Sequence, residues 1–98
     1  MKLYAIRRPS TGQTPEEIQD VGARSLRVGD DEMSDDIRWI RSYVVTEPDG
    51  SLGTVCIYQA SSPEKIREHA FRVEMPATEI WEVADTIVIR PDPVAAAA

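Results

Sequence analysis

The chain has 98 residues, of which 42% are apolar and 29% are charged, and its formal net charge is −6. This length supports one domain with a single modest core, and the composition is that of a globular protein. No apolar run approaches the roughly 18–20 residues of a membrane-spanning helix, the N-terminus has no signal-peptide layout, and the acidic balance disfavours binding to nucleic-acid phosphates. We therefore expect a cytoplasmic protein that binds neither membranes nor nucleic acid.

The first half of the chain predicts a strand, a helix and a second strand. Residues Lys2 to Arg7 alternate as a strand does. The stretch "TPEEIQDVGARSL" predicts a helix, with Thr14 as its N-cap and Glu17 completing a capping box. The acidic stretch Gly29 to Asp36 predicts a solvated loop, since the spacing of an EF-hand calcium loop is absent. Ile37 to Thr46 is rich in β-branched and aromatic residues and predicts a strand.

The second half predicts a hairpin, a helix and a last strand. The turn "EPDGSLG" joins Ile37–Thr46 to a strand at Thr54–Ala60. The stretch "SSPEKIREHAFRV" predicts the second helix, with Ser62 as its N-cap and a proline at its first position. Thr78–Arg90 predicts a long last strand. We expect residues 91–98 to form a flexible tail.

The resulting order, β-α-β-β-α-β, predicts a ferredoxin-like α+β sandwich that occupies residues 1–90 as a single domain. Its two helices can cover only one face of an antiparallel sheet. Strict alternation in the second strand places Trp39, Arg41, Tyr43 and Val45 on one face, so both faces of the sheet are partly apolar. A homodimer in which two sheets face each other would cover the second face.

His69 and Cys56 are the only histidine and the only cysteine. One cysteine excludes a disulfide within the chain and a zinc site of several thiolates from one chain. Any metal site would therefore need carboxylates, phenols or water as well, or ligands from a second subunit. His69 lies beside the apolar stripe of its helix, where it could be a structural residue, a metal ligand or a general base. Cys56 could be a small buried hydrophobe, or a nucleophile with His69 as its base.

Other side chains could join these two. Glu68 is a carboxylate next to His69 and is a candidate metal ligand, although most such acids simply face solvent. Tyr43 and Tyr58 could project into one cavity from paired strands, and with Trp39 they are candidates for binding an organic ligand. The sequence contains no GxGxxG, P-loop, HExxH or GxSxG motif, so no organic cofactor is indicated.

Four stretches, "RWIRSYV", "CIYQA", "REHA" and "MPATEIWEV", resemble a family of small bacterial proteins of unknown function whose best-known type is a nickel-binding protein. The resemblance runs from about Leu3 to Ile89 and is most specific in the second half. It implies a ferredoxin-like sandwich, dimerisation and nickel binding. It implies no ligand set, so His69, Cys56 and Glu68 are candidates by their chemistry only. The acidic stretch Gly29–Asp36 and the longer turn "TEPDGSLG" depart from the family pattern.

Three hypotheses follow. The first is a small dimeric protein that binds nickel or a similar divalent ion. The second is a cofactor-free dimeric enzyme, of isomerase, cyclase or monooxygenase type, whose cavity between helices and sheet holds an apolar ligand. The third is a binding or regulatory module without chemistry. The sequence favours the first and leaves open whether any reaction is catalysed.

Overall fold

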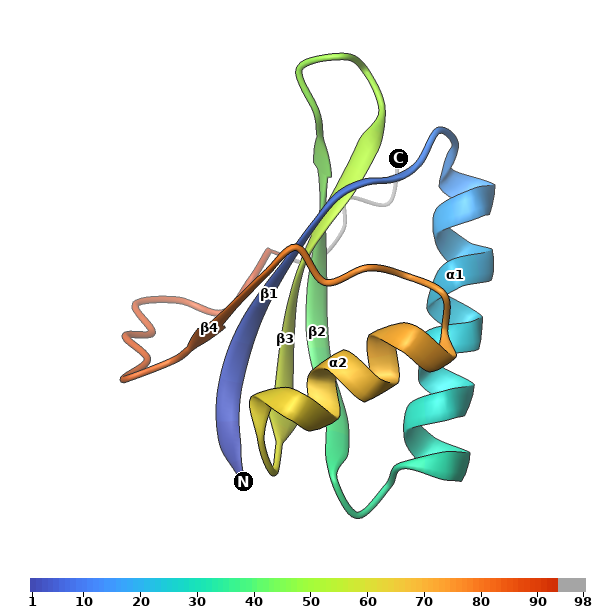
Figure 1. The fold of residues 1–98 in the computed structure, drawn as a ribbon. Helices are drawn as coiled ribbons and strands as arrows, with labels where there is room; N and C mark the ends of the chain where they lie inside the picture. Colours follow the sequence, from blue (N-terminus) through green and yellow to red (C-terminus); the bar gives the residue numbers. More distant parts are fainter. Residues whose placement is uncertain (94–98) are drawn as a thin grey trace.

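The computed structural model describes residues 1–93, which form a four-stranded antiparallel sheet with two helices (Figure 1). The elements in chain order are β1 (Lys2–Gly12), α1 (Pro15–Arg27), the π-helical turn η1 (Val28–Glu32), β2 (Ile37–Thr46), β3 (Leu52–Ala60), α2 (Pro63–Arg72) and β4 (Glu79–Glu82). The strand order is β2-β3-β1-β4, so β1 and β3 form the central pair. The predicted α+β class is confirmed. No helix within residues 1–93 is long and apolar enough to cross a membrane.

Both helices begin where the sequence predicts. The Thr14 hydroxyl accepts a hydrogen bond from the Glu17 amide at 3.2 Å, and the Ser62 hydroxyl accepts one from the Lys65 amide at 3.3 Å. A proline occupies the first helical position in each case. These contacts satisfy amides that have no partner inside a helix, so the two starting points are set by local sequence.

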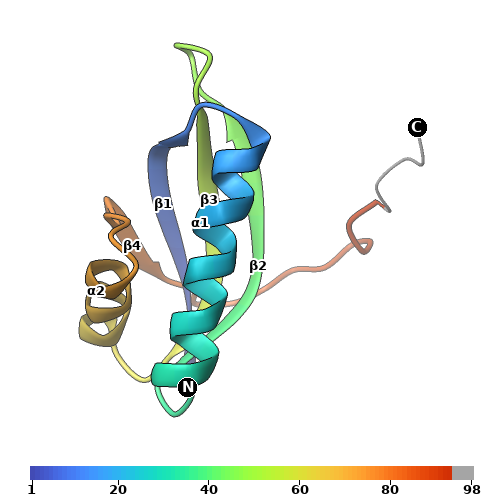
Figure 2. The same cartoon turned by 90° about the vertical axis from the view of Figure 1, so that its right-hand side faces the viewer.

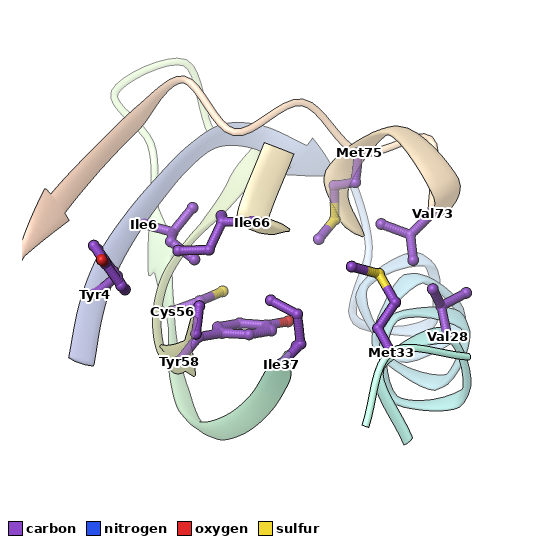
Figure 3. Packing of buried hydrophobic residues seen from close by; sticks show 11 residues of the cluster. Tyr4, Ile6, Val28, Met33, Ile37, Cys56, Tyr58, Ile66, Val73 and Met75 are labelled. Carbon is purple, nitrogen blue, oxygen red and sulfur yellow. The ribbon is translucent and has the colours of Figure 1, made fainter. Parts of the chain in front are cut away.

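The core lies between the sheet and the helices (Figures 1 and 2). The register of β1 against β3 pairs Tyr4 with Tyr58 and Ile6 with Cys56, and all four side chains are buried. Ile66 of α2 packs against this layer (Figure 3). The buried side chains of β1, β3 and α2 are thus in one continuous core, as expected for a domain of this size. The buried apolar cluster comprises Tyr4, Ile6, Val28, Met33, Ile37, Cys56, Tyr58, Ala60, Ile66, Val73 and Met75.

The predicted alternation of β2 is wrong, because a β-bulge interrupts the strand. Trp39 pairs with Tyr58, but the next pairing joins Arg41 to Ile57, so Ile40 is the extra residue. One extra residue exchanges the two faces for everything after it. Trp39 therefore lies on the helix side with Tyr58, whereas Tyr43 lies on the opposite face. The expectation that Tyr43 and Tyr58 share a cavity is corrected accordingly.

The last strand is much shorter than the predicted Thr78–Arg90. β4 runs antiparallel to β1, from the pair Arg7–Glu79 to the pair Tyr4–Glu82. The Val83 amide makes one more hydrogen bond, to the Leu3 carbonyl at 2.9 Å. Because β1 begins at Lys2, the apolar residues that follow have no strand to pair with, and they remain outside the sheet.

The acidic segment is also more ordered than a solvated loop. Helix α1 continues directly into η1, where Val28 and Gly29 are buried, and Met33 immediately after η1 is also buried. Its acidic side chains at positions 30–32 remain exposed. The acidic composition therefore describes one face of a helical extension. Of the tail expected at 91–98, residues 94–98 lie outside the described part of the chain.

We predict that Ile66→Ala lowers the free energy of unfolding by about 2–5 kcal/mol, because it removes a side chain from the fully packed core. The matched control is Phe71→Ala on the same helix, since Phe71 is 84% exposed and its loss should cost far less. Urea unfolding followed by circular dichroism measures both variants. Equal losses for the two would contradict the packing of α2 described above.

Candidate functional site

Five polar or sulfur-bearing residues meet inside the core between the sheet and the helices. We call them the polar core cluster: Arg8 of β1, Ser25 of α1, Cys56 and Tyr58 of β3, and His69 of α2. All five are buried. The β1–β3 register and the packing of both helices bring them together from four separate elements. Buried polar groups are costly unless they are paired, so such a cluster is a candidate for function.

His69 is the residue that α2 contributes, and it is only 1% exposed. Its Nε2 lies 3.0 Å from the Ser25 carbonyl oxygen. A carbonyl oxygen can only accept, so Nε2 carries the proton and the neutral ring keeps its lone pair on Nδ1. Within residues 1–93, Nδ1 has no hydrogen-bond partner. Burial lowers the pKa of His69, and the nearby Arg8 charge lowers it further, so the imidazole is neutral at pH 7.

Arg8 is the charged member of the cluster and is also 1% exposed. Its Nη1 donates to the Cys56 sulfur at 3.5 Å, and its guanidinium lies 5.7 Å from the centroid of the Tyr58 ring. Its Nε and Nη2 atoms have no partner among the described residues, and no carboxylate of residues 1–93 forms an ion pair with it. Arginine stays protonated in proteins, so this part of the core carries a positive charge with only a thiol and a ring beside it.

Tyr58 links the cluster to helix α1. Its hydroxyl lies 2.7 Å from the Ser25 hydroxyl, and its ring meets the His69 ring at a centroid distance of 5.4 Å. Burial raises the pKa of Tyr58 above its usual value, so the phenol stays protonated at neutral pH. Tyr58 can therefore donate or accept a hydrogen bond there but does not supply a negative charge for Arg8.

A cavity of about 370 Å³ lies beside the cluster, between α1 and the sheet. Trp39 and Tyr58 form an aromatic wall, with ring centroids 6.1 Å apart and planes within 10° of parallel. Gly22 of α1 leaves room opposite, since a Cβ built there would lie 3.6 Å from the Trp39 ring. Cys56 and Thr54 of β3 also line the cavity. Its volume and mainly apolar lining suit a small organic molecule.

The structure brings together only some of the residues that the sequence predicts. Trp39 and Tyr58 line the cavity, whereas Tyr43 lies on the other face, where its hydroxyl donates to the Asp92 carboxylate at 2.8 Å. His69 and Cys56 both belong to the polar core cluster. Glu68 is bonded instead to Lys65 at 3.4 Å and to Arg72 at 2.6 Å.

These positions bear directly on metal binding. Within residues 1–93, no three histidine, cysteine, aspartate or glutamate residues lie close enough to hold a metal ion together. The candidate donor atoms within one chain are therefore His69 Nδ1, which has a free lone pair, and the sulfur of Cys56. A complete coordination shell would need further donors from water, from a small ligand or from a second copy.

Sequence reasoning missed Arg8, because the first strand was expected to end at Arg7. The strand in fact runs to Gly12. Extending the alternation of Tyr4 and Ile6 by two residues would have placed Arg8 on the buried face. The sequence therefore did contain a signal for Arg8, because it is a charged residue at the position where the alternation predicts a third buried side chain.

Comparison with known proteins agrees with the resemblance seen in the sequence. The family described as "Nickel responsive protein SCO4226-like" matches residues 4–83. No curated protein matches the chain. The crystal structure of SCO4226 from Streptomyces coelicolor A3(2) is similar with a TM-score of 0.68 and 20% sequence identity, over 87% of this chain and 99% of that one. At this identity the structural likeness shows the fold alone. Since the family match spans most of the sequence, this protein belongs to the SCO4226-like family of nickel responsive proteins.

Proposed function

We propose that this protein is a small cytoplasmic protein that binds nickel or a similar divalent metal ion, with His69 as its nitrogen ligand. The observation that carries the proposal is the state of His69. Its Nε2 proton is held by the Ser25 carbonyl at 3.0 Å, and its Nδ1 lone pair has no partner within residues 1–93. Metal-binding histidines are commonly oriented in this way, with the second ring nitrogen donating to a backbone carbonyl. The description of the family as nickel responsive supports the same conclusion.

Cys56 is the proposed second ligand. Its sulfur belongs to the same buried cluster, and nickel accepts both imidazole and thiolate donors in proteins. Glu68, the carboxylate proposed from the sequence, could join only if its contacts with Lys65 and Arg72 opened. Water or donors from a second copy would complete the shell.

We also infer that the fold is ferredoxin-like and that the protein is a homodimer. The element order and the strand order β2-β3-β1-β4 support the fold. The sheet face opposite the helices supports the dimer, because Tyr43 and Trp81 lie there, 43% and 53% exposed. A second sheet would cover them.

A second candidate function is a cofactor-free enzyme that uses the cavity beside Trp39 and Tyr58. The observation that favours it is the Tyr58 hydroxyl, protonated and positioned by Ser25 next to an apolar space. The nickel experiment below separates the two functions, because an enzyme of this kind would not need a metal.

For the proposed metal site, we expect tag-free wild-type protein to bind nickel stoichiometrically in titration calorimetry. His69→Gln keeps a donor for the Ser25 carbonyl but removes the Nδ1 lone pair, so it should weaken binding at least about tenfold. Glu64→Gln on the exposed side of α2 is the matched control and should bind as wild type does. Cobalt loading adds a test of Cys56, since Cys56→Ser should remove any thiolate-to-metal absorption band. Absence of nickel binding, or equal binding in His69→Gln, would refute the proposal.

The neutral imidazole that this site needs predicts a pH dependence of stability. Because burial lowers the pKa of His69 in the folded chain, the unfolded chain takes up this proton first as the pH falls below about 6.5. The associated stability is therefore present above that pH and is lost on further acidification, with a slope of at most about 1.4 kcal/mol per pH unit for one proton. Urea unfolding between neutral pH and about pH 5 should show this component in wild type. Identical pH slopes in His69→Gln would contradict it.

The proposed dimer predicts a particle twice the chain mass of 10.9 kDa in sedimentation equilibrium. Trp81→Lys places a charge on the open sheet face and should shift the equilibrium toward monomer. Phe71→Lys is the control, because Phe71 is also a large apolar residue and is even more exposed, at 84%, but lies on α2. A monomer at all concentrations for wild type would exclude the dimer.

A further inference from the structure

The Arg8 guanidinium is the least satisfied group in the described part of the protein. Of its three nitrogens, only Nη1 has a partner, and that partner is the weakly accepting Cys56 sulfur at 3.5 Å. Nε and Nη2 are buried and unpartnered within residues 1–93. These two nitrogens form one edge of the planar guanidinium, with their N–H bonds side by side. This edge binds both oxygens of a carboxylate in the common bidentate geometry.

An unpaired buried cation is unfavourable, so an anion is the natural complement of this position. None of the other cluster members supplies one. Tyr58 is kept protonated by its burial, and His69 faces the Ser25 carbonyl. The ionised carboxylates that arginines contact elsewhere in residues 1–93 pair with Arg7, Arg41, Arg67 and Arg72 and not with Arg8. The complementary charge would therefore come from outside the described chain.

The cavity beside α1 gives such an anion a place for its apolar part. Cys56 and Tyr58, which both contact the Arg8 guanidinium, line this cavity. Figure 3 shows Cys56 and Tyr58 side by side on β3. The stacked rings of Trp39 and Tyr58 and the backbone of Gly22 also line the cavity. A flat apolar body would lie against the rings. Arg8 does not itself line the cavity but lies against Cys56 and Tyr58, so an acid group would have to pass between these two side chains to reach the guanidinium.

We propose that the cavity between α1 and the sheet binds a small monocarboxylic acid with an aromatic body, and that Arg8 binds its carboxylate. This site needs no metal and its central residue is not a proposed metal ligand, although Cys56 borders both this site and the proposed nickel site. The charge of Arg8 selects an anion, the rings of Trp39 and Tyr58 select an apolar body, and the volume of about 370 Å³ limits the ligand to roughly one ring and a short chain.

The experiment uses chelator-treated, metal-free wild-type protein, so that a failure of nickel binding does not affect it. Phenylacetate and 3-phenylpropionate are titrated beside their amides, which have nearly the same shape without the charge. We expect each acid to bind at least about tenfold more tightly than its amide, because only the acid pairs with the guanidinium. Equal binding of acid and amide, or no binding of the acids at millimolar concentration, would overturn the proposal.

Three variants test the residues. Arg8→Met should abolish the preference for acid over amide, and Gly22→Leu should fill the cavity and weaken the acids at least about tenfold. Arg38→Met removes the same charge from an exposed position on β2 and should leave the affinities unchanged. Arg8→Met should also unfold at a higher urea concentration than ligand-free wild type, because it replaces an unpaired buried charge by an apolar chain. A large loss of stability instead would make Arg8 a structural cation and refute its assignment as a ligand-binding residue.

Discussion

The antiparallel register of β1 against β3 is the constraint on which the candidate sites depend. It places Tyr4 opposite Tyr58 and Ile6 opposite Cys56, and it carries the same inward-facing row on to Arg8 opposite Thr54. A shift by one residue would move this entire row to the other face of the sheet. The register therefore places both the core residues and the buried charge of Arg8 on the helix side of the sheet. The last strand pairs with the other edge of β1 and ends near Val83, because β1 itself begins at Lys2.

The charge of Arg8 acts differently on the two kinds of ligand considered above. Its positive charge opposes a second positive charge on the imidazole, which adds to the lowering of the His69 pKa by burial. A divalent cation at Nδ1 would meet the same repulsion unless an anionic ligand accompanied it, such as the thiolate of Cys56. An organic anion would instead be attracted.

The polar core cluster lowers the stability that this small core can provide. A chain of 98 residues has a modest hydrophobic core, and unsatisfied buried polar atoms reduce its stability further. Two nitrogens of Arg8 and one of His69 are in this condition within residues 1–93. Buried polar atoms without hydrogen-bond partners are often found at functional sites, where they lower the stability of the protein but can bind a ligand. All three atoms belong to the polar core cluster, whose members Ser25, Cys56 and Tyr58 line the neighbouring cavity, and this is the physical basis for locating function there.

The sequence by itself determined the local features of this protein. The helix starts at Thr14 and Ser62, the strand Ile37–Thr46 and the hairpin turn at Gly50 all follow from caps, β-branched residues and a glycine with positive φ, which act over a few residues. The family could likewise be recognised from short stretches of sequence.

Only the tertiary structure decided how those elements combine into a site. The bulge at Ile40 separates Tyr43 from Tyr58, and nothing in the alternating pattern of β2 reveals it, because a bulge depends on how two strands pair. The long apolar segment after Val83 stays out of the sheet because its neighbour β1 has ended. The cluster of Arg8, Ser25 and His69 comes from three elements far apart in sequence. Local residue preferences cannot specify which distant side chains share the interior, since that depends on the packing of the whole core.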